Sequence, residues 1–278
     1  MEIRTAERSD HPEMLELSQS ERWLLTERDI DLMFDAGGKF VVATDKERLI
    51  AMASCIPYAR YGWLGNIVVC KDARRLGTGR KVTQECIDHL KVKGLTPALF
   101  AYATSKRMYQ KMGFVECGEY VNYGGYLTRD RLERCSDMRV DTGEIGEISR
   151  FDLELWRDDR GVLLRKMAEC GTALSIRDDN GLEGYVIGTM ERGALYVGPW
   201  MARRAQIARV LFNALVEKEM QGKDPLYVDI SIPSINTDGI TFIDSMLKMI
   251  DNVVEMHLGA TEPLNRVGVY GCASLDKG

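Results

Sequence analysis

Apolar and polar residues alternate along the 278-residue chain with two periods, and these periods predict strands and helices. Short runs that are mostly apolar predict buried strands, whereas apolar residues three and four positions apart predict helices with one buried face. In the first half the patterns predict strands at residues 3–6, 40–44, 49–56, 63–70, 99–103 and 114–126. Helices are expected after Ser9 or Asp10, after Thr26, from the loop at 74–80 to about 91–94, and at 105–112.

The second half repeats this order of elements without evident sequence identity to the first. Helices are predicted at residues 145–156, 159–170, 202–220 and 241–249, and strands at 172–176, 182–190, 194–197, 226–232, 252–258 and 267–274. Gly198-Pro199 predicts a turn between the strand at 194–197 and the helix that follows. The charged segment 129–134 is the candidate linker, so we expect two domains, residues 1–128 and 136–278, each long enough to bury its own core.

The composition is that of a globular protein, with 45% hydrophobic and 28% charged residues. We expect a cytoplasmic protein, because no apolar run reaches the roughly 20 residues of a membrane helix and the first residues lack a signal-peptide pattern. Seven cysteines without a C-x-x-C pair predict reduced thiols, and three histidines far apart in the sequence argue against a metal site. A net charge of −5 gives no reason to expect a nucleic-acid partner.

The segment 63–90 is the main candidate for ligand chemistry. An apolar strand pattern at 63–70 leads into Arg74-Arg75-Leu76-Gly77-Thr78-Gly79-Arg80, and a helical pattern follows. The free N–H groups of a first helical turn, the helix dipole and glycines without a Cβ together favour phosphate binding. Three arginines in the loop suit a polyanion. The pattern R-x-x-G-x-G alone is weak evidence, because a tight turn before an ordinary helix would give it too.

A second motif, Tyr109-Gln110-Lys111-Met112-Gly113-Phe114, ends a predicted helix and starts a predicted strand. Together with the loop and its spacing, this motif resembles the GNAT superfamily of acetyl-CoA-dependent N-acyltransferases over residues 3–126. The resemblance implies an α/β (α+β) fold in which a mixed, mostly antiparallel sheet is flanked by helices. In such a sheet the fourth and fifth strands splay apart, and the pantetheine arm of acetyl-CoA enters between them.

The resemblance also implies roles for individual residues. The backbone of Val68 and Val69 would line the acetyl-pantetheine, and the pyrophosphate would be bound by Arg74, Arg75, Leu76, Gly77, Thr78, Gly79 and Arg80. Tyr109 stands where the family keeps its general acid, because a phenol of pKa about 10 can hydrogen-bond or protonate a departing thiolate. Packing under the cofactor is the alternative role for Tyr109. The family often has an asparagine seven residues before this tyrosine, where the present chain has Tyr102, so the pantetheine contacts at that position stay open.

The segment Trp23…Thr26…Asp29 resembles a subgroup of GNAT proteins that carry a second, degenerate GNAT domain. The second half resembles that degenerate domain, and the ending at 273–278 is similar to the ending of the subgroup. Its counterpart of the phosphate loop, residues 198–204, lacks the paired glycines. Residues 245–250 stand in place of the Tyr-x-Lys-x-Gly-Phe motif. We therefore expect one CoA per chain, and a second domain that covers the acceptor cleft of the first.

These observations predict an acetyl-CoA-dependent N-acyltransferase that moves an acetyl group to a primary amine by direct transfer in a ternary complex, without a metal. A non-catalytic CoA-binding sensor or interaction protein on a GNAT fold is the alternative. The amine acceptor, small molecule or peptide, stays open, as does the formation of a homo-oligomer. Glu21, Glu27, Glu116 and Glu119 are all candidate general bases, and the sequence singles out none of them.

Overall fold

The computed structural model describes residues 1–278 except 22, 24, 47, 134–137 and 260–264. Its strands are β1 (Glu2–Thr5), β2 (Lys39–Asp45), β3 (Arg48–Pro57), β4 (Tyr61–Val69), β5 (Thr96–Tyr102), β6 (Phe114–Leu127), β7 (Asp141–Thr142), β8 (Thr172–Asp178), β9 (Gly181–Glu191), β10 (Ala194–Ala202), β11 (Leu226–Pro233), β12 (Lys248–Leu258) and β13 (Val269–Gly271). Its α-helices are α1 (His11–Ser20), α2 (Glu27–Asp35), α3 (Thr78–Val92), α4 (Ala103–Lys111), α5 (Ile145–Trp156), α6 (Gly161–Cys170), α7 (Ala205–Glu219) and α8 (Thr237–Asp244).

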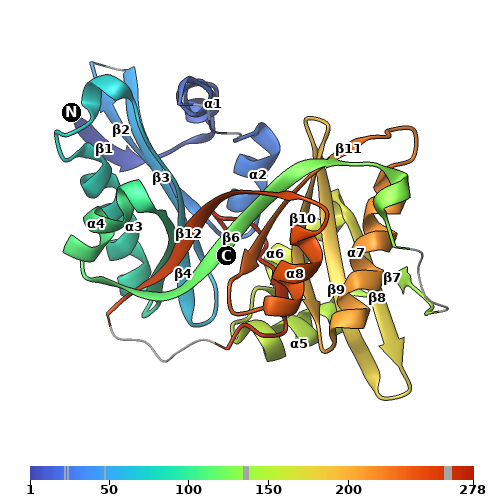
Figure 1. The fold of residues 1–278 in the computed structure, drawn as a ribbon. Coiled ribbons are helices and arrows are strands. Elements are labelled where there is room, and N and C mark those ends of the chain that lie inside the picture. Colours follow the sequence, from blue (N-terminus) through green and yellow to red (C-terminus); the bar gives the residue numbers. More distant parts are fainter. Residues whose placement is uncertain (22, 24, 47, 134–137, 260–264) are drawn as a thin grey trace.

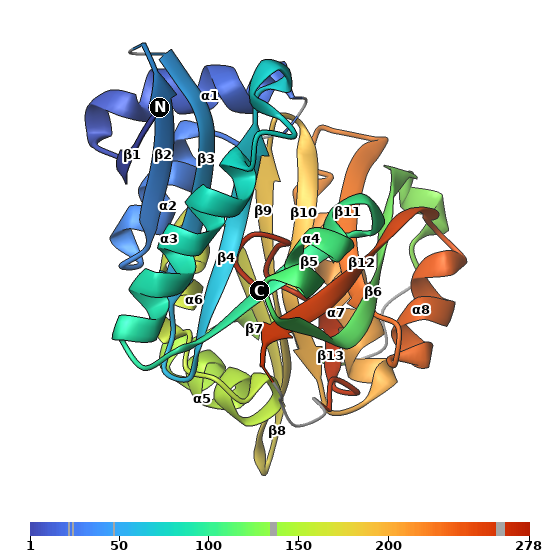
Figure 2. The same cartoon turned by 90° about the vertical axis from the view of Figure 1, so that its left-hand side faces the viewer.

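The described strands form one 13-stranded sheet, in the order β1-β2-β3-β4-β5-β12-β6-β11-β10-β9-β8-β7, with β13 beside β10. Among these strands only β4–β5 and β10–β11 pair in parallel, so the sheet is mixed and mostly antiparallel, as predicted. Helices α3 and α4 lie outside the first half of the sheet and α7 outside the second, whereas α2 and α6 lie between the halves (Figure 1). The end of the chain also lies between the halves, in the middle of the molecule (Figure 1 and Figure 2).

Local sequence signals explain the helices near the predicted phosphate loop. Thr26 caps α2, since its hydroxyl accepts a hydrogen bond from the Asp29 amide at 3.2 Å and the Asp29 carboxylate accepts one from the Thr26 amide at 3.2 Å. Helix α3 buries a stripe of Val82, Cys86 and Leu90 against the sheet. The helices expected after Thr26 and after the loop at 74–80 are confirmed.

The two halves exchange their strands in the middle of the sheet. Strand β12, from the second half of the sequence, pairs with β5 through Val253–His257 and with β6 along its whole length. Strand β6, from the first half, pairs on its other side with β11. The hydrogen bonds of each half are therefore completed by a strand from the other. The division into 1–128 and 136–278 stays a prediction, and residues 134–137, where its linker ends and its second domain starts, lie outside the described residues.

Three predictions in the second half are wrong. Strand β10 runs through Gly198-Pro199 to Ala202 instead of turning there, because β9 pairs along it on one side and β13 on the other. Helix α7 consequently begins at Ala205. Helix α8 ends at Asp244 rather than 249, and the residues from Lys248 onward belong to β12, where β6 supplies their hydrogen bonds.

Two further features of the described residues concern membrane spanning and metal binding. No described helix is long and apolar enough to cross a membrane. In the part of the chain that the structure describes, six cysteines are free and no group of three or more His, Cys, Asp or Glu side chains is arranged to hold a metal ion.

Candidate functional site

The candidate site begins where β4 and β5 part. The two parallel strands pair only from Tyr61 with Thr96 to Leu64 with Leu99. Beyond Leu64, β4 continues to Val69 and its described pairing there is with β3 alone. The predicted splay between the fourth and fifth strands is therefore confirmed, and it leaves one edge of β4 open toward the predicted phosphate loop.

The loop at 74–80 bends at a glycine that its backbone requires. Gly77 precedes α3 with φ +80°, a left-handed conformation that a side chain would strain. Gly79 lies in the first turn, where an added Cβ would stand 3.1 Å from Cγ2 of Val69, so that position keeps the helix close to β4. Thr78 donates from its hydroxyl to the carbonyl of Ala73 at 3.2 Å. These contacts aim the first-turn amides of α3 at the end of β4.

The three arginines of the loop differ in their surroundings. Arg74 donates to the carbonyl of Val69 at 3.1 Å and pairs with Glu21, so it ties the loop to β4 and to the segment after α1. Arg75 and Arg80 are exposed, and no hydrogen bond or ion pair joins them to another described residue. Leu76, between them, is 71% exposed. Arg75 and Arg80 are thus the loop cations that are free to meet an anion.

Tyr109 lies on α4, where its side chain is only 5% exposed. Its ring packs edge-on against Phe114 at 5.9 Å between centroids. Burial raises the pKa of Tyr109 above that of an ordinary phenol, so the hydroxyl keeps its proton at neutral pH. Within the described residues the hydroxyl has no hydrogen-bond partner, and it is available to a ligand.

The end of the chain covers β4 just beyond the point of separation. A Cβ on Gly65 would meet the backbone of Asp276 at 2.6 Å. The side-chain amide of Asn66 donates to Asp276 at 3.0 Å and to the hydroxyl of Ser54 at 3.1 Å. Buried Lys277 places its ammonium 3.2 Å from Asp29 and 2.9 Å from Asp276.

Sequence reasoning did not identify this group of residues. Asn66 and Asp276 are 210 positions apart, and no local pattern connects residues so distant. The positive φ of Asn66 (50°) is a backbone property that asparagine tolerates, but asparagine alone does not reveal it.

Among the described residues of the second half there is no comparable opening. Strands β10 and β11 pair in parallel only over Ala194–Tyr196, yet β13 then lies beside β10 and pairs with Trp200 and Met201. A Cβ on Gly198 would stand 1.8 Å from the carbonyl oxygen of Cys272, so the chain itself fills the space beside this strand. Before α7, Arg203 pairs with Glu154 at 2.7 Å and Arg204 with Glu183 at 2.9 Å, and these carboxylates occupy both cations.

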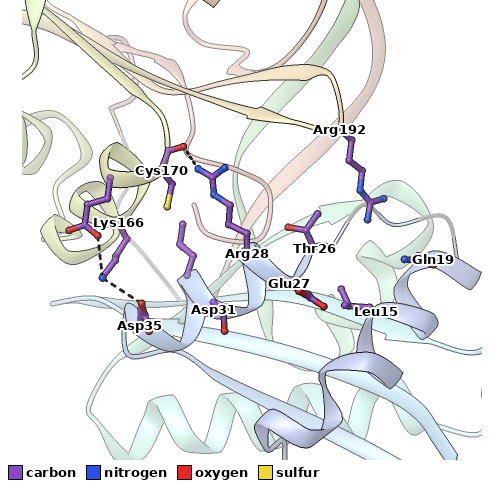
Figure 3. Close-up of a pocket in the computed structure, with 12 residues that line it drawn as sticks. Leu15, Gln19, Thr26, Glu27, Arg28, Asp31, Asp35, Lys166, Cys170 and Arg192 are labelled. Carbon is purple, nitrogen blue, oxygen red and sulfur yellow. Dashed lines mark hydrogen bonds and ion pairs between the residues drawn. The ribbon is translucent and has the colours of Figure 1, made fainter.

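A groove of about 610 Å³ lies elsewhere between the halves, among α1, α2 and α6 (Figure 3). Lys166 of α6 reaches across it to Asp35 of α2 at 3.5 Å and pairs with Glu169 of its own helix at 3.2 Å, and Arg28 donates to the carbonyl of Cys170. The groove is lined by Leu15, Gln19, Thr26, Glu27, Arg28, Asp31, Leu32, Asp35, Lys166, Glu169, Cys170 and Arg192. Glu27 is one of the candidate general bases, and none of the lining residues is a predicted cofactor-binding residue.

Comparisons with known proteins agree with this geometry. Residues 2–114 match the acetyltransferase (GNAT) family, and residues 148–271 match an acetyltransferase (GNAT) domain. The chain is 24% identical over 227 residues to YitH, an uncharacterised N-acetyltransferase of Bacillus subtilis (strain 168), with 80% of this chain and 77% of YitH covered.

Two solved structures share the whole fold. A putative acetyltransferase from Pyrococcus horikoshii has a TM-score of 0.82 at 21% identity, with 100% of this chain and 95% of that chain covered. A tandem GNAT protein from the clavulanic acid biosynthesis pathway has a TM-score of 0.67 at 14% identity, with 94% and 99% covered. With two matched GNAT domains and this topology, the chain belongs to the GNAT superfamily as a tandem N-acetyltransferase.

Proposed function

We propose that the chain transfers the acetyl group of acetyl-CoA to a primary amine by direct transfer in a ternary complex. The observation that carries the proposal is the opening of β4 from β5 beyond Leu64, beside the glycine-bent N-terminus of α3. An opening between strands suits a thin chain such as pantetheine, and the helix N-terminus suits its pyrophosphate. Because β13 lies beside β10 in the second half, we propose one CoA per chain.

The residues of the loop fit this ligand. Arg75 and Arg80 would neutralise the pyrophosphate together with the first-turn amides of α3. Arg74 would hold the loop against Val69, since Glu21 already pairs with it. When bound, acetyl-CoA would supply the acetyl group as a thioester. A backbone N–H at Val68 or Val69 would donate a hydrogen bond to the thioester oxygen, as an oxyanion hole does.

Tyr109 would stabilise the departing thiolate. The conjugate acid of that thiolate has a pKa of about 8.5, well below the raised pKa of Tyr109, so full proton transfer from the phenol is unfavourable. Tyr109 would therefore act mainly by donating a hydrogen bond to the sulfur, and the proton that the amine loses could then reach the thiolate through solvent.

The proposed acceptor is an uncharged primary amine formed within the site, since an alkylamine of pKa about 10.4 is protonated in water at neutral pH. We place the reaction in the cytoplasm, which the six free cysteines support.

A test combines purified protein, acetyl-CoA and a panel of primary amines, and measures free thiol together with the mass of each amine. We expect thiol release that depends on an amine, with one acetylated amine for each thiol. Tight binding of acetyl-CoA without thiol release for any amine in the panel would contradict the proposal and favour a CoA-binding sensor.

A further inference from the structure

The sheet has an inner face, which we define as the side of β4 and β5 opposite α3. A Cβ on Gly62 would meet Leu90 of α3, so its neighbour Trp63 faces the other way. The ring of Phe100 on β5 lies 5.1 Å from that of Trp63, between centroids, and therefore also faces inward. Side chains two residues apart in a strand share a face. Tyr102, two residues after Phe100, therefore also lies on the inner face, at the carboxyl end of β5.

A cavity of about 400 Å³ lies at this end of β5. It is lined by Tyr102, Ala103, Thr104, Met249, Asp251 and Asn252, from β5, the start of α4 and β12. The position is next to the proposed chemistry for two reasons. It lies at the carboxyl end of β5, beyond the point where β4 and β5 separate, and Tyr109 belongs to the same helix as Ala103. Figure 2 shows β5, β12 and α4 together, with β9 and β10 of the second half behind them.

On the inner face, a row of hydrogen-bonded side chains leads from this cavity to β6 and β11. Asp251 accepts a hydrogen bond from the side-chain amide of Asn122 on β6. The oxygen of that amide accepts one from the hydroxyl of Ser231 on β11 at 2.6 Å. Asp229 lies two residues before Ser231 on the same face, and its neighbour across the strand pair is Tyr196. Two carboxylates from different strands, Asp251 on β12 and Asp229 on β11, thus face one region.

The charges in this region are not balanced within the described protein. No ion pair reaches Asp229 or Asp251, and none of the cavity's lining residues is a lysine or an arginine. Burial and the charge of Asp251 raise the pKa of Asp229 to about 6. Burial and both carboxylates raise the pKa of Tyr102 to about 12, which shows that this ring senses the same field. A cation between the carboxylates would offset their repulsion, and aromatic rings at the edge of the cavity would attract the cation further.

The inner face already holds one primary ammonium in this way. Lys277 is 5% exposed and its Nζ lies between Asp29 at 3.2 Å and Asp276 at 2.9 Å, and Asp276 itself lies against Gly65 of β4. Beside this face, two carboxylates therefore offset the charge of one buried ammonium group.

We propose that Asp229 and Asp251 bind a second ammonium group of the acceptor, which is therefore a small diamine or polyamine. This inference rests on the proposed function. One amine of the acceptor would lose its proton and attack the thioester at β4, while the other would stay protonated in the cavity beside Asp251. The carboxylates would select acceptors by charge and by the spacing of the two amines.

The experiment compares 1,4-diaminobutane and spermidine with butylamine, which has the same carbon chain as the diamine but a single amine. The proteins are the wild type, Asp229→Asn, Asp251→Asn and the control Asp179→Asn, which removes an exposed carboxylate from the β8–β9 turn. We expect the wild type to favour the diamine over butylamine by about tenfold or more in kcat/KM, through KM, as for a charge-assisted contact. Each of the two site variants should lose that preference, while its Kd for acetyl-CoA and its rate with butylamine stay within about twofold.

The outcomes separate this inference from the proposed function. Acetylation of butylamine and the diamine with equal kcat/KM would overturn the diamine inference and leave the proposed function standing. A preference that survives in Asp229→Asn and Asp251→Asn would also overturn it. If no amine releases thiol, the proposed function fails, and calorimetry with spermidine alone still tests the cavity. Binding to the wild type that is lost in both site variants and kept in Asp179→Asn supports the cavity, whereas no binding to the wild type overturns it.

Discussion

Replacing Asp229 by asparagine should stabilise the protein without ligand, and more so at pH 8 than at pH 5. The carboxyl group of Asp229 has a pKa of about 6 in the folded chain, against a usual 3.8. Because its folded pKa is the higher one, ionisation opposes folding. This destabilisation is absent below the unfolded pKa, grows between pH 3.8 and 6, and is complete above pH 6 to 7. The neighbouring phenols of Tyr102, Tyr196 and Tyr227 have raised pKa values and stay neutral throughout this range.

The difference between the folded and unfolded pKa of Asp229 sets the size of this destabilisation. Two pKa values separated by this amount imply a destabilisation of about 2 kcal/mol at pH 5 and about 3 kcal/mol at pH 8. Asp229 is only partly buried, and water reduces both figures, so we expect the difference between the two pH values to be about 1 kcal/mol. For a chain of this size, that corresponds to roughly 2–4 °C in Tm.

Thermal unfolding at pH 5 and pH 8, followed by calorimetry, measures the effect. The gain in Tm of Asp229→Asn over the wild type should be larger at pH 8, whereas Asp179→Asn should show no such dependence. Spermidine should raise the Tm of the wild type at pH 8 and leave that of Asp229→Asn unchanged. A gain that is equal at both pH values, or a variant less stable than the wild type at pH 8, would refute the assignment of an unbalanced carboxylate at this position.

Three further predictions concern acetyl-CoA. Arg75→Glu combined with Gly77→Asp should weaken acetyl-CoA binding by about 3 kcal/mol or more, as measured by calorimetry, because charge-assisted hydrogen bonds are lost and a carboxylate is placed beside the pyrophosphate. An unchanged Kd in a folded variant would contradict the assignment of the loop at 74–80 to the pyrophosphate. Tyr109→Phe should lower kcat by roughly ten- to a thousandfold with nearly unchanged acetyl-CoA affinity, whereas an equal loss of both would indicate that Tyr109 only packs under the cofactor. The wild type should bind one acetyl-CoA per chain, and a second site that survives the loop substitutions would show that β13 does not close the second half.

The sequence predicts well where a structure depends on neighbouring residues. The helix at 145–156 has the predicted bounds, because a single apolar stripe and a following Arg157 with φ 69° define it locally. The glycines of the loop likewise indicate the bend at Gly77, whereas the opening of β4 from β5 is what the resemblance to the GNAT superfamily implies.

Prediction fails where distant strands decide the outcome. Lys248 and the residues after it continue a helical pattern in the sequence, but in the structure they lie in the sheet beside β6. Asn236 starts α8 earlier than expected, since its side chain accepts from the amide of Gly239 at 2.9 Å and donates to the carbonyl of Val269 at 2.8 Å. The contact with Val269 spans 33 positions, and the local sequence does not encode it.

The same limit applies to the site. The phosphate loop and Tyr109 are contiguous motifs, and a single sequence can suggest them. Asp229, Asp251 and Tyr102 come from β11, β12 and β5, which share one region of the sheet only because β12 pairs with β5 and β6 joins β12 to β11. An aspartate inside an apolar strand pattern, such as Asp229 in β11, is the one local signal that could have drawn attention to this region, because burying a carboxylate without a partner is unfavourable.

The strand exchange gives the second half a role in the first. Strand β12 completes the hydrogen bonding of β5 and brings Asp251 to the end of that strand, while β6 joins the whole arrangement to β11 and so to Asp229. The inner face of the proposed acceptor cleft is therefore assembled from both halves, even though only the first has an opening between its parallel strands. Removing the second half would take away a strand that pairs with β5 together with both carboxylates of the proposed cleft, so a second GNAT domain proposed to bind no CoA can still be retained under selection for the acceptor.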